Sequence, residues 1–436
     1  MKEFIKKMIG QRHPLVLFYH KAKAWLAVTF YMNPSRKIKV IGITGTNGKT
    51  TTVNLVDDLL EAAGYKVGLT STVRYKIGDT VWSNRDKMTT QSPFFLQKML
   101  YKMVKAGCDY AVVEVTSHAV DQSRIYGINF DVVAITNLTG DHIEYHGSME
   151  EYMHAKGKFI GSAYGMRRKK DILKTVIVNA DDEYYDYFNQ FKGDQKYVYG
   201  VKDGSVKASN IVLGGKKTTF SLKIPNDAIE IEMELLGEFN VYNSLLAISV
   251  GISQGLSLQA IAHALKTIKP VGGRFEPVNV GQKFSVIVDY AHTPDALQKL
   301  LGLFKPLTKG KVILVFGCTG GGRDKSKRPV MGQVADSMAD VIVLTDDDPY
   351  EEDRWQIIQD IAVGINREEG DNLYKIIGRT DAIHFALNLA EEGDAVLIAG
   401  KGGEEVIVIG KDKIPYDDRV VVRHVLSESL YSDVVY

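Results

Sequence analysis

The chain has 436 residues, of which 45% are hydrophobic and 25% are charged, and its formal net charge is +1. This length exceeds one comfortable core, so we expect two or three domains with the composition of a soluble globular protein. The small net charge argues against nucleic acid as a partner. The two cysteines, Cys108 and Cys318, exclude a disulfide framework and a cysteine-based zinc site, and they favour a reducing cytoplasm.

The N-terminal segment is basic and aromatic. Residues 1–39 carry nine Lys/Arg against Glu3 alone, and Leu15–Met32 predicts a helix that begins after Pro14. Lys21 and Lys23 interrupt the apolar run, so neither a membrane-spanning helix nor a signal peptide fits. We favour a helix that packs its aromatic face on the body of the protein. The alternative is peripheral membrane contact through residues 1–37, near anionic lipid or a lipid-linked substrate.

The segment Val40–Leu60 predicts a phosphate-binding loop. A short apolar run leads into a glycine-rich loop, and GKT then opens a helical pattern. Ile43 stands where the strict GxxxxGK[ST] pattern has glycine, and the alternative is an ordinary glycine-rich turn. Main-chain N–H groups at the start of a helix bind phosphate, and a lysine and a threonine hydroxyl complete a site for ATP and Mg²⁺. The predicted nucleotide contacts are Gly45, Thr46, Asn47, Gly48, Lys49, Thr50 and Thr51.

Strand-like and helical patterns alternate along two stretches of the chain. The first runs from Val40 to about Val178 and is followed by three strand-like runs and two helical ones; the second begins after KPVGG at Lys269–Gly273. Such alternation predicts α/β folds with mainly parallel sheets. We therefore expect a helical appendage at 1–37, a central P-loop ATP-binding domain at 38–270 and a Rossmann-like, doubly wound domain at 271–436.

Three further groups follow apolar runs, where open α/β sheets place their ligands. Glu114 is the last but one residue of YAVVEV, Asp141 and His142 follow VVAITNLTG, and Lys156 lies on the next predicted helix. A carboxylate and an imidazole at neighbouring strand ends predict a second Mg²⁺ beside the phosphates. Taken alone, a glutamate at a strand end is more often an exposed charge, His142 more often a hydrogen-bonded loop residue, and Lys156 an exposed helix lysine.

Seven ordered motifs resemble those of the Mur ligase family: GTNGKTTT, EVTSHAVDQSR, TNLTGDHIEYHGSMEEYMHAK, GRFE, DYAHTPDAL, GRDKSKRP and AGKGGEE. The resemblance covers roughly residues 38–425. It implies an ATP-dependent ligase that adds the third residue of the peptidoglycan stem peptide through an acyl phosphate. It also implies two Mg²⁺ ions and a carbamate on Lys156, which turns a repelling ammonium into an anionic ligand.

The resemblance assigns roles to further residues by their positions in these motifs. The implied catalytic residues are Lys49, Glu114, His142, Lys156 and Arg274, with Thr50, Glu114, His142 and Lys156 at the metal ions. Asn243, Arg274 and Asp289 match additional ATP contacts. Thr89, Thr90, Ser117 and Arg124 match residues that contact the muramoyl peptide. Arg323, Asp347, Asp348 and Glu404 match the site of the incoming amino acid.

Two departures from the family pattern affect the expected substrates. Fewer than forty residues precede the first strand, too few for the family's uridine-binding domain, so a partner protein replaces it or the donor lacks UDP and is, for example, lipid-linked. The motif that reads DNPR in diaminopimelate ligases is Asp347-Asp348-Pro349-Tyr350 here, and KGGE replaces the KGHE of many relatives. Without the arginine, a second carboxylate loses its bidentate partner, so we predict an amino acid other than diaminopimelate.

Two alternatives remain beside an amide ligase. A P-loop kinase or generic NTPase would not need the C-terminal motifs. A catalytically silent nucleotide-binding protein would have no reason to keep Lys49, Glu114, His142 and Lys156 together.

Overall fold

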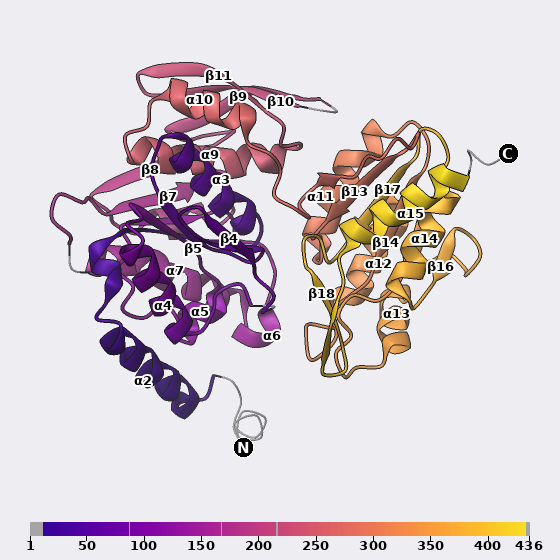
Figure 1. Ribbon diagram of the computed structural model, residues 1–436, viewed down its shortest axis with the longest axis horizontal. Helices are drawn as coiled ribbons and strands as arrows, with labels where there is room; N and C mark the ends of the chain where they lie inside the picture. Colours follow the sequence, from indigo (N-terminus) through magenta and orange to yellow (C-terminus); the bar gives the residue numbers. More distant parts are fainter. Residues whose placement is uncertain (1–11, 87, 167, 215–216, 433–436) are drawn as a thin grey trace. The chain divides into compact units, whose positions relative to one another are not determined.

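The computed structural model describes residues 12–86, 88–166, 168–214 and 217–432. The chain forms two compact units, which meet between residues 269 and 270 of the sequence. Figure 1 shows both units, which are described separately below. Each contains a sheet with helices on both faces. The predicted class, α/β with a mainly parallel sheet and a second sheet domain, is confirmed.

The first unit is built on an 11-stranded sheet, counted over the described residues, in the order β11-β10-β9-β8-β7-β6-β1-β5-β2-β3-β4. From β9 through β8, β7, β6, β1 and β5 to β2, neighbouring strands pair in parallel. At one edge β10 and β11 continue the sheet in antiparallel pairing, and at the other edge β3 and β4 do the same. The strands are β1 Lys39–Thr44, β2 Val67–Thr70, β3 Arg74–Ile77, β4 Thr80–Ser83, β5 Tyr110–Glu114, β6 Val132–Ile135, β7 Thr175–Asn179, β8 Gln195–Gly200, β9 Val206–Leu213, β10 Thr218–Ile224 and β11 Asp227–Met233.

Helices cover both faces of this sheet because its central strands are apolar on both sides. On β1, Ile41 and Ile43 join one core and Val40 joins the other. Helices α3, α9 and α10 pack in the first core, and α4 and α7 pack in the second (Figure 1). The helices are α2 Pro14–Phe30, the 3-10 turn η1 Pro34–Lys37, α3 Lys49–Ala62, α4 Pro93–Lys105, α5 Ser117–Asp121, α6 Ile143–His146, α7 Met149–Gly165, α8 Tyr185–Asn189, α9 Glu238–Ser253 and α10 Leu258–Thr267.

The second unit has a six-stranded sheet, within the described residues, in the order β12-β13-β17-β14-β15-β16. Strands β13 to β17 pair in parallel, and β18 and β19 form a separate hairpin. The strands are β12 Glu276–Pro277, β13 Ser285–Asp289, β14 Val312–Phe316, β15 Val341–Leu344, β16 Leu373–Lys375, β17 Ala395–Ala399, β18 Val406–Ile409 and β19 Asp412–Pro415. The helices are α11 Pro294–Phe304, the 3-10 turn η2 Lys305–Leu307, α12 Lys327–Met338, α13 Arg354–Ala362, α14 Arg379–Leu389 and α15 Asp418–Ser432.

The N-terminal helix α2 forms where the sequence predicts it, but our favoured view of its orientation is wrong. Its buried residues are Val16, Ala24 and Ala27, whereas Phe18 and Trp25 are exposed. The helix packs beside α4, and its Val28 lies so close to Gly127 that a Cβ there would meet Val28 Cγ2 at 2.5 Å. A close approach of this kind selects small side chains, so the aromatic ones lie on the other face. Within the described residues, no helix is long and apolar enough to cross a bilayer.

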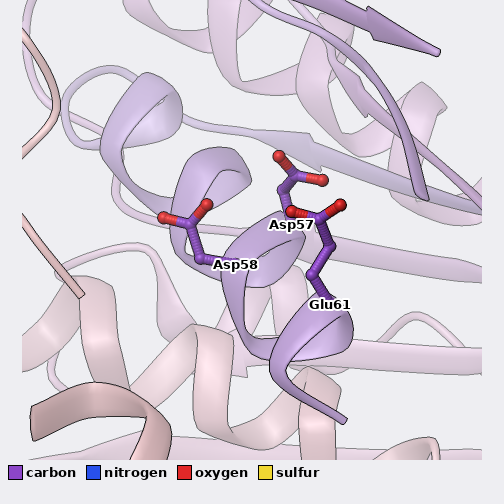
Figure 2. A group of neighbouring side chains, drawn as sticks. All are labelled: Asp57, Asp58 and Glu61. Carbon is purple, nitrogen blue, oxygen red and sulfur yellow. The ribbon is translucent and has the colours of Figure 1, made fainter. Parts of the chain in front are cut away.

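An ion-pair network joins α3 to the edge strand β3. Figure 2 shows its three carboxylates, Asp57, Asp58 and Glu61. Lys76 Nζ lies 2.8 Å from Asp57 Oδ1 and 2.5 Å from Glu61 Oε2, and Arg74 contacts Asp57 and Asp58. Burial raises the pKa of Asp57 to about 6 against the opposing effect of Lys76. Because lysine and arginine already supply the cations, the network is structural.

Replacing Lys76 by methionine should destabilise the first unit by about 3 kcal/mol, because it leaves the buried Asp57 carboxylate with Arg74 as its remaining cation. Urea unfolding followed by the fluorescence of Trp82, whose ring is 5.9 Å from that of Tyr75, measures the change. Lys217→Met is the control, because Lys217 forms an exposed pair with Glu232 that contributes at most about 1 kcal/mol. Equal losses in the two variants would show that burial of the pair does not matter.

Candidate active site

The predicted phosphate-binding loop connects β1 to α3, and glycine is required at two of its positions. Gly45 has a φ of +143° and Gly48 a φ of +83°, which other residues rarely adopt. A Cβ on Gly48 would also lie 2.2 Å from Asn243 Oδ1. The loop therefore leads directly into the N-terminus of α3, where main-chain N–H groups and the helix dipole favour an anion.

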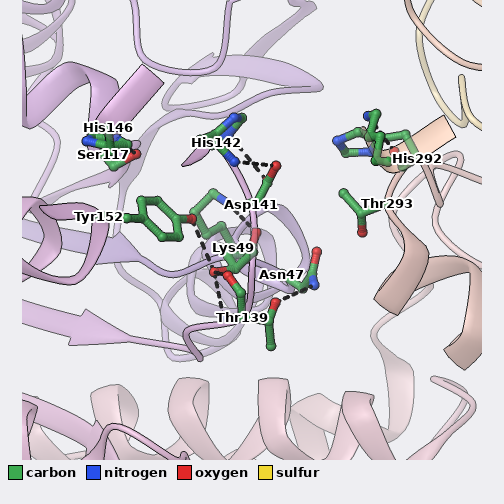
Figure 3. Close-up of polar contacts among 12 residues, drawn as sticks. Asn47, Lys49, Ser117, Thr139, Asp141, His142, His146, Tyr152, His292 and Thr293 are labelled. Atoms are coloured by element: carbon green, nitrogen blue, oxygen red, sulfur yellow. Dashed lines mark hydrogen bonds and ion pairs between the residues drawn. The ribbon is translucent and has the colours of Figure 1, made fainter. Parts of the chain in front are cut away.

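Two lysines converge on this loop from different helices. Lys49, the first residue of α3, donates from Nζ to Gly45 O at 3.0 Å and to Thr46 O at 2.7 Å. Lys156, on α7, donates from Nζ to the same Gly45 O at 2.7 Å. Figure 3 shows Lys49 and Tyr152, and the Tyr152 ring centroid lies 4.4 Å from Lys156 Nζ. Two lysine side chains thus meet at the carbonyl of Gly45, in the predicted phosphate-binding loop.

Lys156 is 1% exposed, in contrast to the exposed lysine that its sequence position alone suggested. Burial, and then the nearby Lys49 ammonium, lowers the pKa of Lys156 well below its ordinary value. Asp141 and Asp182 oppose the shift. The lowered pKa favours the neutral amine, which is the form of lysine that acts as a nucleophile.

Thr50, in the first turn of α3, and Glu114, at the end of β5, lie together, whereas the sequence pattern paired Glu114 with His142. Thr50 Oγ1 donates to Glu114 Oε1 at 2.9 Å, and Thr72 donates to Glu114 from its amide at 2.8 Å and from its hydroxyl at 3.0 Å. Adjacent oxygen ligands of octahedral Mg²⁺, with bonds near 2.1 Å, are about 3 Å apart. The Thr50–Glu114 pair therefore has the oxygen donors and the spacing that Mg²⁺ requires.

His142 lies in the loop before α6 and has a φ of +56°. Its Nε2 is 3.4 Å from Asp141 Oδ2, and its ring centroid is 4.7 Å from that of His118 (Figure 3). Within the described residues, no hydrogen bond or ion pair joins His142 to Glu114. The structure thus brings together Thr50 with Glu114 and Lys49 with Lys156, and it places His142 in a neighbouring cluster of histidine and tyrosine rings.

The four residues matched to the muramoyl-peptide pocket surround the end of β5. Thr89 accepts a hydrogen bond from Thr72 at 3.0 Å, and Thr90 Oγ1 donates to Glu114 O at 2.9 Å. Arg124 Nη1 donates to Thr90 O at 2.7 Å, and burial lowers its pKa. Ser117 Oγ lies 3.0 Å from His146 Nε2, and burial lowers the pKa of His146 to about 4.

Asn243, on α9, lies against the phosphate-binding loop. Its Oδ1 accepts from Thr52 Oγ1 at 3.3 Å, and its Nδ2 donates to Asn240 Oδ1 at 3.0 Å. Asn137 and Tyr152 hold the loop on its other side. Asn137 Oδ1 accepts a hydrogen bond from Asn47 N at 3.0 Å, and Tyr152 OH lies 3.1 Å from Thr46 Oγ1 (Figure 3). These contacts hold the loop in position.

In the second unit, Arg274 lies just before β12, and Asp289 is the last residue of β13. The Arg274 guanidinium is 4.2 Å from the Tyr290 ring centroid. Asp289 accepts from Phe275 N at 2.8 Å and from Ala291 N at 2.9 Å. Burial raises the pKa of Asp289, and Arg274 opposes the shift. Asp289 therefore organises the turn that carries Arg274.

A buried lysine that our sequence reasoning did not single out lies at the centre of the predicted amino-acid site. Lys401 is 0% exposed, and its Nζ lies 2.9 Å from Asp348 Oδ1, 3.2 Å from Glu404 Oε2 and 3.6 Å from Asp347 Oδ1. Burial opposes protonation, but the carboxylates of Asp347, Glu404 and Asp348 raise the pKa of Lys401. Lys401 is the lysine of the KGGE motif, so its position beside Glu404 was the available signal.

Tyr350 occupies the position of the arginine in DNPR. It has a φ of +54°, and its main chain bonds to β18 through Val408 O at 3.2 Å and to Gly410 N at 2.7 Å. Its ring packs against Gly321, where a Cβ would meet Tyr350 Cγ at 2.7 Å. Burial raises the pKa of Tyr350, and the nearby Arg323, which is exposed, opposes the shift. A tyrosine here offers a hydroxyl in place of the fork of a guanidinium.

The glycine that departs from KGHE has a steric cause. A Cβ on Gly403 would lie 2.4 Å from Gly272 O, and one on Gly273 would lie 1.7 Å from Gly403 N. The two glycine pairs therefore pack main chain against main chain within the second unit. No side chain fits at residue 403 while Gly272 and Gly273 keep this position.

Replacing Gly403 by alanine should destabilise the second unit by about 1–3 kcal/mol, because the new methyl group must displace the Gly272 backbone. Thermal unfolding measures the loss. Gly165→Ala is the control, because a Cβ there meets nothing within 4 Å. If both variants unfold at the same temperature, the close approach of the two loops is not part of the native structure.

Comparison with known families gives two matches. The Mur ligase middle domain matches residues 43–251, and the Mur ligase glutamate ligase domain matches residues 273–402. Among curated proteins, a UDP-N-acetylmuramoyl-L-alanyl-D-glutamate--2,6-diaminopimelate ligase of Geobacillus kaustophilus is 42% identical over 95% of this chain and 84% of its own length. A UDP-N-acetylmuramyl-tripeptide synthetase of Roseiflexus sp. is 37% identical over 94% of this chain and 82% of its own length.

Solved structures agree with these matches. A structure of a UDP-N-acetylmuramoyl-L-alanyl-D-glutamate--2,6-diaminopimelate ligase is similar with a TM-score of 0.61 at 30% identity, covering 90% of this chain and 79% of that one. The folylpolyglutamate synthase of Mycobacterium tuberculosis, complexed with ADP and AMPPCP, shares the fold with a TM-score of 0.69 at 18% identity, covering 87% and 92%.

Proposed function

The chain belongs to the Mur ligase family of ATP-dependent amide ligases of peptidoglycan synthesis, and on that premise we propose that it joins a muramoyl dipeptide to an amino acid. The observation that carries this proposal is the meeting of Lys49 and Lys156 on Gly45 O, beside a phosphate-binding loop whose Thr50 contacts Glu114. The arrangement places the Lys49 ammonium, the amine of Lys156 and the oxygen ligands Thr50 and Glu114 where a nucleoside triphosphate would lie.

The proposed reaction has two steps. A carboxylate oxygen of the peptide attacks the γ-phosphorus of ATP and releases ADP, which forms an acyl phosphate. The neutral amino group of the amino acid then attacks the acyl carbon, and the tetrahedral intermediate expels phosphate and loses a proton to form the amide. In the first step a carboxylate anion approaches the anionic phosphates of ATP, and in the second an amine lone pair approaches an anionic acyl phosphate. Positioning of the reactants and neutralisation of their charges therefore provide most of the catalysis. Lys49 supports both functions from the start of α3.

Magnesium fits the residues present, as the Thr50–Glu114 spacing indicates. Mg²⁺ would neutralise the phosphate charges, with Thr50 and Glu114 as ligands and with His142 and Lys156 at a second ion. Lys156 contributes as a carbamate, formed when its neutral amine attacks CO2 and releases a proton. The lowered pKa of this lysine, caused first by burial, supports that modification.

The remaining predicted residues have proposed roles in substrate binding. Gly45–Thr51 bind the phosphates, and Asn243 and Arg274 contribute to ATP binding, Arg274 from a turn that Asp289 holds; contact of Asp289 with the ribose stays a prediction. Thr89, Thr90, Ser117 and Arg124 face the donor peptide from the end of β5. A muramoyl peptide that ends in a D-glutamate carboxylate is the donor that the names of the relatives suggest.

For the incoming amino acid, we propose a site at Arg323, Asp347, Asp348 and Glu404, in which opposite charges hold the two ends of a zwitterion. Tyr350 favours a substrate without a second carboxylate, such as lysine, because tyrosine provides no bidentate partner. Diaminopimelate is the second candidate, since close relatives are named as diaminopimelate ligases. The two substrates differ by one carboxylate, so a direct comparison separates them.

Release of phosphate from ATP should require both UDP-N-acetylmuramoyl-L-alanyl-D-glutamate and an amino acid, with lysine preferred to diaminopimelate in kcat/KM. A malachite-green assay with an amino-acid panel measures this requirement, and mass spectrometry identifies the amide. Release without any amino acid would indicate a kinase or NTPase, and no release would indicate a silent protein or a donor without UDP. A preference for diaminopimelate would refute the role given to Tyr350.

A further inference from the structure

Helix α2 exposes a face that is more apolar than the face it buries. Five large side chains of this face are between 53% and 71% exposed, whereas the buried residues are Val16, Ala24 and Ala27. The exposed set is Leu15, Phe18, Trp25, Leu26 and Phe30. Figure 1 shows α2 at the periphery of the first unit. A helix that is apolar on all sides is normally covered on all sides, so this face needs an occupant.

Lysines border this face on both sides. At 3.6 residues per turn, the five exposed side chains occupy about 140° of the helix circumference. Lys21 projects beyond the edge at Trp25, and Lys23 projects beyond the opposite edge at Phe30. This arrangement of aromatic and aliphatic side chains between flanking lysines is the pattern of helices that lie in a membrane interface, where the lysine ammonium reaches the headgroups.

The chain segment that contains α2 is basic, and so is the neighbouring helix α4. From Phe4 to Val56 the sequence contains no Asp or Glu. Helix α4, which packs beside α2, has no acidic residue and exposes Lys98, Lys102 and Lys105. The chain as a whole has a net charge of only +1, so this positive charge is local. A surface that binds here should therefore be anionic.

A groove adjoins the same face. It has a volume of about 530 Å³, and Trp25 and Thr29 of α2 form one of its walls. Tyr126 and Met166 contribute apolar surface, and Arg36 and Lys158 contribute cations. Apolar walls with cations among them suit a phospholipid, whose phosphate would meet the cations while its glycerol and upper acyl carbons meet the walls.

We propose that α2 and this groove dock the protein on an anionic phospholipid bilayer. The face lies in the interface, with Phe18, Trp25 and Phe30 among the upper acyl chains. The charge decides against a second copy of the chain, because a symmetric contact would bring Lys21 and Lys23 of two copies together. The docking surface is independent of the ligase site, so either proposal can fail without the other.

Vesicle co-sedimentation of the full chain tests this proposal. Vesicles of phosphatidylglycerol and phosphatidylcholine in equal parts should sediment the protein, and vesicles of phosphatidylcholine alone should bind at least about tenfold less. Added salt should weaken the binding because it screens the lysines. Equal binding to the two vesicle types, or binding to neither, would overturn the proposal.

Matched variants separate a docking face from a general effect of charge or exposed surface. The double variants F18S/W25S and K21E/K23E should each lower binding at least about tenfold. K283E/K411E makes the same charge change at lysines that are 77% and 87% exposed in the second unit, and V363S removes an apolar side chain that is 79% exposed. Both controls should bind like the wild type. Loss of binding in the controls as well would contradict a specific face.

Two further measurements guard against misfolding and against another occupant. In the variant W82F/W355F, Trp25 is the single tryptophan, and its emission should shift to the blue when anionic vesicles are added. The α2 variants should keep the wild-type unfolding temperature and the lipid-free rate of phosphate release. Ultracentrifugation should find a monomer; a dimer that F18S/W25S dissociates would show that a second copy covers the face and would overturn the proposal.

Discussion

Replacing Lys156 by alanine should lower the rate of ligation by roughly two to three orders of magnitude, the usual effect of removing one preorganised charge from an active site. Lys156 Nζ lies 2.7 Å from Gly45 O, inside the phosphate-binding loop, and the residue is 1% exposed. Its neutral amine can become a carbamate, and alanine supplies neither an amine nor an anion. Phosphate release with the muramoyl dipeptide and lysine measures the rate.

Lys158→Ala is the matched control for this variant, because Lys158 is exposed on the same helix α7. Its rate should equal that of the wild type. If the carbamate is formed, short carboxylates such as acetate should restore part of the activity of Lys156→Ala, and ¹³C-labelled CO2 should give a carbamate signal in the wild type alone. Full activity of Lys156→Ala would remove Lys156 from the mechanism.

Replacing Lys401 by methionine should destabilise the second unit by about 3–5 kcal/mol and abolish ligation, because a buried charge cluster loses its cation. Lys401 Nζ lies within 3.6 Å of carboxylate oxygens of Asp347, Asp348 and Glu404. We assign these three carboxylates to the site of the amino acid, so the variant should lose their arrangement, and with it amino-acid binding, as well as stability. Urea unfolding, followed by Trp355 in the variant W25F/W82F, measures the loss in this unit.

A second change distinguishes charge from packing. Adding Asp348→Asn to Lys401→Met removes one of the repelling carboxylates and should restore part of the stability. Lys411→Met, at an 87% exposed lysine, should change stability by no more than about 1 kcal/mol. If the double variant is less stable than Lys401→Met, packing of the lysine stem and not its charge holds the cluster.

The sequence predicts the architecture well where strands are apolar and long. Runs such as Tyr110–Val115 and Val312–Phe316 correspond to β5 and β14, because central parallel strands are buried on both faces. The short strands β2, β3 and β4 were not predicted, since four-residue strands at a sheet edge have little periodicity. The favoured orientation of α2, with its aromatic face packed on the protein, was wrong, because hydrophobicity alone does not show which side of an apolar helix is covered.

Some residues of the candidate site could likewise be predicted from the sequence, and others could not. Lys49, Thr50 and Glu114 follow from a motif and from strand ends, and the structure brings Thr50 and Glu114 to 2.9 Å. Thr72 and Lys401 were not predicted as site residues, because their contacts with carboxylates depend on tertiary packing. The burial of Lys156 is likewise a property of the folded chain, and a lysine in a helical pattern gives no sign of it.

Oxygen transfer from the donor carboxylate to phosphate tests the acyl-phosphate mechanism most directly. The donor is prepared with ¹⁸O in its terminal carboxylate and incubated with the protein, ATP, Mg²⁺ and the amino acid, and the phosphate released is analysed by mass spectrometry. Attack of the carboxylate on ATP predicts inorganic phosphate that carries one ¹⁸O from the donor for each amide formed. Amide formation with unlabelled phosphate would contradict the mechanism.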